Sequence, residues 1–470
     1  MARQTPVASG MKAWPRTDVG RTRVAVAPVM IQLRRYGLWL TVALIFCMVA
    51  LPSYAEIRPG GLPNISPARW LRFALVGLTL ILLLIKPFRV PLTEFSGAET
   101  RRLWRMVAVF FSWYFVLNIF LNYSNGFFIN DIINNILPPW LAFAFAAIYI
   151  RREEDFTWLF RALALAAIVV VCVMPIEFVL KRNVFEKIMS SEGWNQVGLV
   201  DQSRDGVYRV KGTFEHPLLC AQFLITVGVA FFAKGFFDRA KGRLFWMFMG
   251  ALTLGSVVLT YTRSSMVLGA GLVGLIFVVK FMAWTSKFSN RLTATVLRVQ
   301  LMWLPFILMV AALWVFELLR GRTADESISS EARVSMLVRG IPAIFDSPVW
   351  GHGSGEGAKI AGFKGYFGSY FLDNIYLVYA LDYGLIYCLL FMAILGLAIW
   401  RLCPSYEELR VPQANTGVRA GMAMALMASA TMLVVHASVG LHQFIFGLIG
   451  ASLCLPGRRF RISPYKRRGL

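Results

Sequence analysis

Charged residues are scarce in this sequence. Only 16% of its 470 residues are charged, 57% are hydrophobic, and the mean hydropathy is +0.61. A soluble globular chain is about half apolar and about a quarter charged. The apolar residues also occur in long blocks, and a helix that crosses a bilayer needs roughly 20 of them. The composition therefore excludes an ordinary soluble enzyme and predicts an all-α, polytopic integral membrane protein.

The patterns that bind metals and nucleotides are missing as well. The four histidines show no HExxH spacing, and no Asp-x-Asp pair occurs that could hold a metal diphosphate. The glycine-rich stretch GHGSGEG (351–357) follows no predicted strand, opens no predicted helix and lacks the lysine of a phosphate-binding loop. His436 and His442 flank a short predicted turn, and we interpret them as packing residues. We expect no metal ion and no cofactor.

Twelve apolar segments are long enough to be membrane helices. Around them we expect a basic N-terminal segment (1–36), a membrane domain (37–456) and a basic C-terminal tail (457–470). Two longer connections, 181–216 and 320–373, fall on the same predicted side, the outer one. The second of them contains an expected amphipathic helix for the membrane surface. The twelve segments lie at about 37–54, 70–85, 106–122, 132–150, 156–180, 217–237, 244–261, 265–284, 300–319, 374–400, 419–436 and 440–456.

The excess positive charge is predicted to lie on the side of the membrane opposite the two longer connections. The net charge is +23, from 48 Lys and Arg against 25 Asp and Glu. If both termini lie in the cytoplasm, the cytoplasmic side contains the whole excess, as the positive-inside rule requires. The basic composition then reflects topology, so we expect membrane lipids as partners and no nucleic acid. The first segment ends in Ser53-Tyr54-Ala55, which loosely resembles a signal-peptidase site, but its leader is too long and we expect an uncleaved helix.

Five basic residues are predicted to gather at the outer boundary of the membrane. Arg263 lies between two apolar segments with almost no connection, so rigid helices hold it there. It either snorkels to lipid headgroups or binds a ligand. Arginine forms bidentate pairs with phosphate oxygens, so the group favours a receptor for a lipid-linked phosphate. Its members are Arg209, Lys211, Arg263, Arg333 and Arg339.

The stretch RVKGTFEHP (209–217) predicts an ordered turn before the sixth segment. Pro217 is suited to the first position of a helix. Glu215 and His216 lie just above that helix end and are candidate substrate-binding residues. The alternative is that His216 only caps the turn and Glu215 is solvated.

A third candidate stretch is DNIYLVYALDYGLI, which begins at Asp373. Asp373 and Asn374 directly precede the tenth segment. Asp373 either caps this helix through its carboxylate or accepts a proton from a substrate hydroxyl, and the two roles do not exclude each other. Asp382, about two turns deeper, is expected to find an internal partner.

In chain order, these stretches resemble the O-antigen ligase and O-antigen/exopolysaccharide polymerase superfamily over about 205–400. The motifs that carry the resemblance are RVKGTFEHP from Arg209, LTYTRSS around Arg263, SEAR ending at Arg333, DSPVWGHG ending at Gly353, and the stretch from Asp373. The resemblance implies metal-independent glycosyl transfer at the outer face of a bacterial cytoplasmic (inner) membrane. The implied donor is a glycan on polyprenyl diphosphate, typically undecaprenyl diphosphate.

The resemblance also implies roles for individual residues. Arg209 and Arg263 match arginines that hold the lipid diphosphate, and Asp373 stands where ligases usually have a histidine before the asparagine. This departure favours a polymerase of lipid-linked repeat units over a ligase that moves glycan to lipid A-core or protein. We therefore expect Asp373, Arg263 and Arg209 to be catalytic. The expected substrate-binding residues are Lys211, Glu215, His216, Arg333, Arg339 and Asn374.

A rival of another class is a transporter or flippase of lipid-linked glycan. Transporters place charged residues near the bilayer midplane in broken helices. Here the predicted cations gather at one face, which favours interfacial catalysis. A chain-length regulator and a flippase are the expected protein partners, because the systems that the chain resembles contain them.

Overall fold

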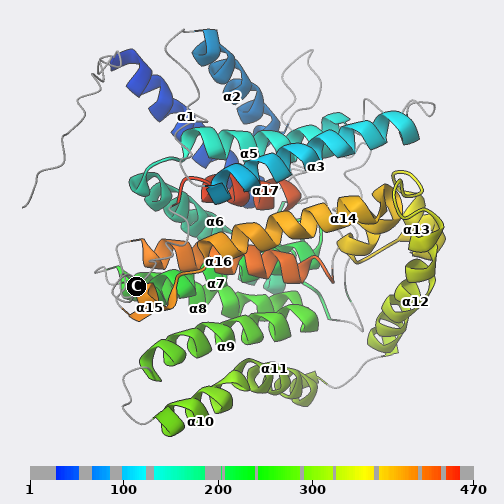
Figure 1. The fold of residues 1–470 in the computed structure, drawn as a ribbon. Helices are drawn as coiled ribbons and strands as arrows, with labels where there is room; N and C mark the ends of the chain where they lie inside the picture. Colours follow the sequence, from blue (N-terminus) through cyan, green and yellow to red (C-terminus); the bar gives the residue numbers. More distant parts are fainter. Residues whose placement is uncertain are drawn as a thin grey trace, which may run out of the picture.

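The structure, a computed structural model, is built almost entirely of α-helices (Figure 1). It describes residues 28–51, 66–84, 98–122, 132–185, 203, 207–238, 242–285, 291–320, 324–364, 370–410, 415–435 and 441–455. The first half contains α1 (Pro28–Ala50), α2 (Pro67–Leu84), α3 (Ala98–Asn122), the π-helical turn η3 (Ile132–Ile136), α5 (Leu137–Tyr149), α6 (Glu153–Leu180), α7 (Pro217–Phe237) and α8 (Arg243–Ser256).

The second half continues with a 3-10 turn, more helices and one short hairpin. Its elements are η6 (Val257–Thr260), α9 (Arg263–Thr285), α10 (Arg291–Met302), α11 (Leu304–Arg320), α12 (Ala324–Asp346), α13 (Glu356–Ala361), β1 (Phe363–Lys364), β2 (Tyr370–Phe371), α14 (Ile375–Leu402), α15 (Tyr406–Arg410), α16 (Thr416–Met432) and α17 (His442–Ser452). The two strands pair antiparallel, with Phe363 opposite Phe371.

Eight of the described helices are long and apolar enough to cross a membrane, so the protein is an all-α membrane protein. In a bilayer such helices satisfy all their backbone groups internally. The other four predicted segments also coincide with helices over their described parts: α2, α5, α16 and α17. The number of twelve crossings stays a prediction. The eight helices cover Gln32–Ala50, Glu99–Leu121, Glu154–Leu180, Pro217–Phe237, Arg243–Thr260, Arg263–Thr285, Thr295–Trp314 and Ile375–Leu402.

The first helix begins earlier than the sequence predicts. We expected it from residue 37, but α1 begins at Pro28, inside the predicted basic segment. The reason is tertiary, because Arg34 on this added turn pairs with Asp155 at the start of α6, 3.5 Å between Nη2 and Oδ2. The predicted peptidase-like site at Ser53 to Ala55 lies outside the described residues.

Helix α7 is the centre of the bundle, and nearly all its residues are buried. Small residues allow its neighbours to approach closely. A Cβ on Gly250 of α8 would lie 2.6 Å from the Phe232 nitrogen, and one on Gly421 of α16 would lie 2.8 Å from the Ala230 carbonyl oxygen. Such contacts are typical of membrane helix interfaces, where packing replaces the hydrophobic effect between helices.

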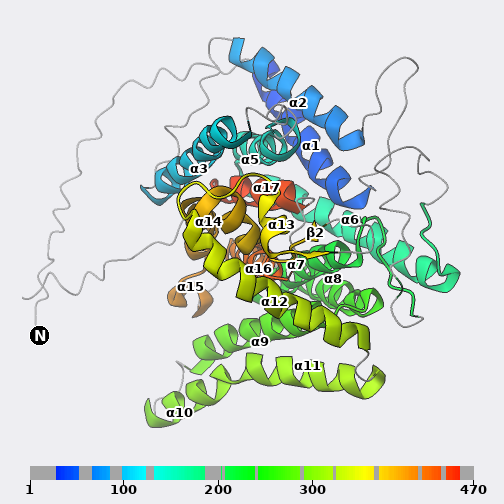
Figure 2. The same ribbon diagram turned by 90° about the vertical axis from the view of Figure 1, so that its right-hand side faces the viewer.

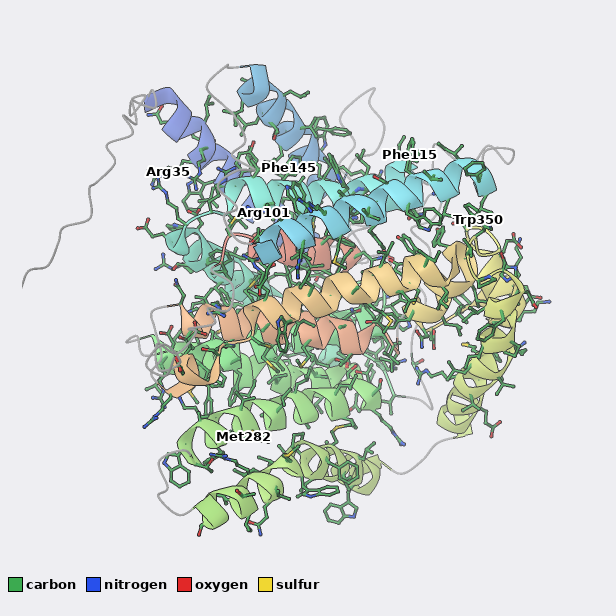
Figure 3. All side chains as sticks on the ribbon, in the orientation of Figure 1. Arg35, Arg101, Phe115, Phe145, Met282 and Trp350 are labelled. Carbon is green, nitrogen blue, oxygen red and sulfur yellow. The ribbon has the colours of Figure 1, made fainter. Side chains whose placement is uncertain are left out.

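The helices α7, α9 and α14 all begin at the same end of the bundle, which we call the loop end. Helix α16 runs antiparallel to α7, and its last turn reaches the loop end. There the Ile375 amide at the start of α14 donates to the Leu433 carbonyl, 3.0 Å. The Val210 amide, before α7, donates to the Leu259 carbonyl, before α9, 3.2 Å. Figure 3 shows Trp350 at this end, with Arg35 and Arg101 toward the other.

The first described helix begins, and the last one ends, away from the loop end. The end of α1 reaches the loop end, since the Thr213 hydroxyl donates to the Val49 carbonyl, 2.8 Å. The end of α17 lies at the opposite end, where Arg401 of α14 donates to the Ser452 carbonyl, 2.7 Å. The first described helix thus begins at the end of the bundle where the last described helix ends, while the location of both termini stays a prediction.

Helix α12 crosses the loop end at a steep angle to the spans (Figures 1 and 2). Its Met336 and Ala343 are buried together with Leu377 and Leu381 of α14. Its exposed face carries apolar residues at helical spacing, namely Val334, Val338, Ile341 and Phe345. A helix thus forms in this connection, as predicted, while its place on the membrane surface stays a prediction.

Candidate functional site

The segment that carries Arg209 is tied to three neighbouring elements. Arg209 is only 3% exposed, and its Nε donates to the Thr260 carbonyl, 3.2 Å. The Gly212 carbonyl accepts from Asn183, 3.2 Å, directly after α6. With the Thr213 bond to α1, these contacts fix a buried arginine at the loop end. Burial strengthens the field of such a cation, because the surrounding dielectric constant is low.

Glu177 of α6 also holds this segment. Its carboxylate accepts from the Tyr208 hydroxyl (2.9 Å), the Lys211 amide (3.1 Å) and the Gly212 amide (2.7 Å). Gly212 has a left-handed backbone, φ 59°. Lys211 is as buried as Arg209. The sequence analysis missed Glu177, although a lone carboxylate in an apolar segment is a signal for a functional or structural site.

Arg263 begins α9 immediately after the turn η6. The chain reverses at Tyr261, whose backbone is left-handed with φ 48°. The hydroxyls of Thr260 and Thr262 are 2.8 Å apart and brace this reversal. Arg209 binds the Thr260 carbonyl, three residues before Arg263. The structure therefore brings the segments of the two predicted catalytic arginines together.

The two residues before α7, Glu215 and His216, agree with the alternative in which His216 acts as a cap. His216 is the N-cap, and its Nδ1 accepts from the Leu218 amide, 3.1 Å. Glu215 is exposed. Pro217 occupies the first helical position, as predicted. The substrate-binding roles of Glu215 and His216 stay predictions.

Asp373 does not cap α14, so the capping alternative is wrong. Asn374 is the N-cap, and its Oδ1 accepts from the amides of Tyr376 (3.0 Å) and Leu377 (3.2 Å). Asp373 instead pairs with Arg333 of α12, 3.4 Å between Oδ2 and Nε. Both side chains are 34% exposed, so this carboxylate remains open to a ligand. The cap thus frees Asp373 for another role.

Arg339 lies on the same helix as Arg333 but has different neighbours. Its guanidinium donates to the Ser335 hydroxyl and to the Gly362 carbonyl, each 3.3 Å. It therefore ties α12 to the end of α13 and is itself exposed. The structure brings Arg333, but not Arg339, to Asp373.

The glycine-rich loop packs on a break in α14. At Gly384 the backbone leaves the helical conformation, φ 86° and ψ 163°. The Leu385 amide donates to Pro348 (2.7 Å), and the His352 amide donates to Leu381 (2.7 Å). Two loop amides, of Gly355 and Gly357, donate to the Asp382 carboxylate at 2.9 and 2.7 Å. Asp382 thus has the internal partner that we expected.

The loop also differs from its prediction. We expected no helix after it, but the six-residue α13 begins at Glu356. The amides of Gly355 and Gly357, at the start of this helix, donate to the Asp382 carboxylate. This anion explains why a short helix forms there. Tyr383, next along α14, donates to Ser354, 2.9 Å, and lies 2.9 Å from the Tyr114 hydroxyl.

The three histidines that the structure describes show no arrangement that suggests a metal. His442 is buried at the start of α17, and its Nδ1 lies 3.3 Å from the Tyr379 hydroxyl. His352 Nε2 lies 2.9 Å from the Ala343 carbonyl. His436 lies outside the described residues. Within the part of the chain that the structure describes, no three His, Cys, Asp or Glu side chains are grouped closely enough to hold a metal ion.

The loop end therefore contains two assemblies. One combines Arg209, Lys211 and the start of α9 with Arg263, and its buried cations suit an anionic group. The other combines Asp373, which is about one-third exposed, with Arg333, and its carboxylate suits proton acceptance. Both lie where α7, α9 and α14 begin.

No protein-family model matches the chain, and no curated protein is similar enough in sequence to count as a relative. The family resemblance of the motifs therefore stays a hypothesis, and the function has to be argued from the residues.

Proposed function

We propose that this membrane protein is a polymerase of lipid-linked oligosaccharide repeat units, with a glycan on undecaprenyl diphosphate as donor. The observation that carries the proposal is the bond from Arg209 to Thr260, which joins the segment of one basic motif to the turn before Arg263. Two motifs about 50 residues apart thereby form one cationic assembly at a helix end. A base candidate, Asp373, lies at the same end.

The arginines would stabilise the leaving group. In the transfer, the acceptor hydroxyl oxygen bonds to the anomeric carbon, and the bond from that carbon to the diphosphate oxygen breaks. The electron pair leaves with the lipid diphosphate, so negative charge grows there. Cations fixed before the reaction stabilise this growing charge more than they stabilise the ground state. Arg209 and Arg263 are the residues proposed for this role, with Lys211 beside them.

The acceptor hydroxyl has to lose its proton during the same step. Asp373 is proposed to accept it, because a carboxylate can do so only if a substrate can reach it. Its one-third exposure meets that condition. Arg333 pairs with this carboxylate, and Asn374 holds the start of α14 in place. A ligase remains the alternative within the family, with lipid A-core or a protein as acceptor.

A transporter is favoured by one observation, the break of α14 at Gly384. In transporters, unwound backbone groups at such breaks coordinate the substrate. Here the glycine-rich loop satisfies groups at the break, as the amides of Leu385 and His352 show. The site of ligand coordination is thereby filled by the chain itself, which supports the enzyme over the transporter.

The decisive experiment uses the purified protein in proteoliposomes with undecaprenyl-diphosphate-linked repeat units. A polymerase lengthens the lipid-linked glycan and releases undecaprenyl diphosphate. Transfer to added lipid A-core identifies a ligase, and movement of intact donor across the bilayer without bond formation identifies a transporter. Absence of chain growth with active, folded protein would refute the proposal.

The proposed setting is the bacterial cytoplasmic membrane, crossed twelve times, with both termini in the cytoplasm and the loop end outside. Reporter fusions at Met1 and Leu470 test this topology. Both should report a cytoplasmic location. A periplasmic signal from both fusions would place the loop end in the cytoplasm and remove the site from the proposed substrate.

A further inference from the structure

The proposed mechanism gives no role to Glu177, a buried carboxylate on α6. Glu177 has no exposed surface, and its two oxygens accept three hydrogen bonds. Removing a carboxylate from water is costly unless donors replace the lost water. All three donors come from one short stretch, at Tyr208, Lys211 and Gly212. The carboxylate and this stretch therefore depend on each other.

Two of the donors are successive backbone amides, those of Lys211 and Gly212. Successive N–H groups in a turn form a concavity that binds anions. Such concavities often hold a phosphate, but here the anion is a side chain from a neighbouring span. Gly212 contributes the left-handed conformation, φ 59°. The conformation of the turn therefore depends on an anion supplied by α6.

Arg209 lies within the stretch from Tyr208 to Gly212 that is hydrogen-bonded to Glu177. The Tyr208 bond precedes it and the Lys211 bond follows it, so both flanks are attached to one carboxylate. The Arg209 side chain itself donates to the Thr260 carbonyl, at 3.2 Å, three residues before Arg263. If the flanks moved, this contact and the spacing of the two arginines would change.

We propose that Glu177 is a positioning residue, which supplies the anion for the Lys211–Gly212 turn and thereby holds Arg209 in place to bind the lipid diphosphate. This inference rests on the proposed function. It assigns Glu177 no contact with substrate. A loss of the Glu177 charge should therefore weaken donor binding more than it slows the turnover of bound donor.

Helix α6 contains a matched control at its other end. Asp155 also accepts from two successive amides, those of Arg151 (2.8 Å) and Arg152 (2.7 Å), and is also buried. Asp155→Asn removes the same kind of contact from the same helix, far from the loop end. Any loss of stability common to both variants is then distinguishable from an effect on Arg209.

The experiment compares Glu177→Gln with Asp155→Asn in proteoliposomes, using undecaprenyl-diphosphate-linked repeat units. Glutamine has one acceptor oxygen and an NH₂ group that cannot accept, so at least one amide bond is lost. We expect the KM for the donor to rise about 10- to 100-fold in Glu177→Gln, as for a lost bond to a charged group. The kcat at saturating donor should change less than about threefold, and Asp155→Asn should leave both constants within about twofold.

Hydrogen exchange gives a readout without turnover. In Glu177→Gln the amides of Lys211 and Gly212 should exchange faster than in the wild type, while those of α7 stay protected. If Glu177→Gln does not fold, Tyr208→Phe removes one donor and leaves the carboxylate. Its donor KM should then rise by a smaller factor, and no rise would overturn the inference.

The outcomes distinguish a failure of the proposed function from a failure of the inference about Glu177. Wild-type protein that neither binds nor uses the lipid-linked donor overturns the proposed function, and the inference with it. Active wild type with equal donor KM values in Glu177→Gln and Asp155→Asn overturns the inference alone.

Discussion

Asp373→Asn tests the mechanism most directly. The sequence allowed Asp373 to cap α14, to accept a proton, or both, and the structure removes the capping role. Asn374 caps α14 and does not need its neighbour's carboxylate. The substitution keeps the size of Asp373 and removes only the charge. The contact it weakens is the ion pair with Arg333, 3.4 Å, in which each side chain is 34% exposed.

The expected effects on stability and rate differ greatly. A pair this exposed contributes about 0–1 kcal/mol to the free energy of unfolding, so the thermal transition should hardly move. Loss of a general base costs about 10²–10⁴-fold in rate, or about 3–5 kcal/mol in activation free energy. We therefore expect a folded Asp373→Asn protein that binds the donor but does not join repeat units.

The assay measures release of undecaprenyl diphosphate in a single turnover with saturating donor. Arg333→Gln breaks the same ion pair but keeps the carboxylate, so it should affect donor affinity more than the single-turnover rate. Asn374→Ala removes the cap and should cost about 1 kcal/mol of stability. A native single-turnover rate in Asp373→Asn would show that Asp373 is not the base, and Glu215 or His216 would be tested next.

Three further outcomes are expected. Arg263→Lys should remain severely impaired in polymer formation at normal abundance, because a point charge does not reproduce a bidentate fork; full activity would mean that Arg263 only anchors α9. Gly351→Ala should lower the unfolding free energy by about 1–3 kcal/mol more than Gly355→Ala. Both glycines have positive φ, but of the two only Gly351 would bring a Cβ against backbone, at the Asp382 carbonyl oxygen; equal thermal shifts would contradict this. Burial alone would raise the pKa of Glu408, but the Ser405 amide and Arg419 outweigh it and lower that pKa. Stability from this pair is therefore complete above the unfolded pKa near 4.5 and is lost as the pH falls through the lower folded value, so Glu408→Gln should flatten the acid limb of a stability-against-pH curve.

Much of the helical architecture was predictable from the sequence. An apolar block of span length has to be helical in lipid, whatever its neighbours, because no water is available to its backbone groups. Local signals also placed some ends. Pro217 begins α7 at the expected position. The start of α1 was not predictable. Arg34 comes just before the apolar block, where the pattern of a membrane helix stops, and its partner Asp155 is 121 residues away in the sequence.

The composition and order of charged residues determined which side chains belong to the loop end, since sidedness follows from where the spans begin and end. Tertiary structure alone decided their partners. Asp373 pairs with Arg333 and leaves the cap to Asn374. The Glu177 carboxylate reaches an amide 35 residues away. These contacts depend on how the spans pack and how the loops return to them, and no local propensity encodes that geometry. The sequence thus determined a membrane bundle with the candidate site residues at one end, and packing determined which of those residues hold each other and which remain open to a substrate.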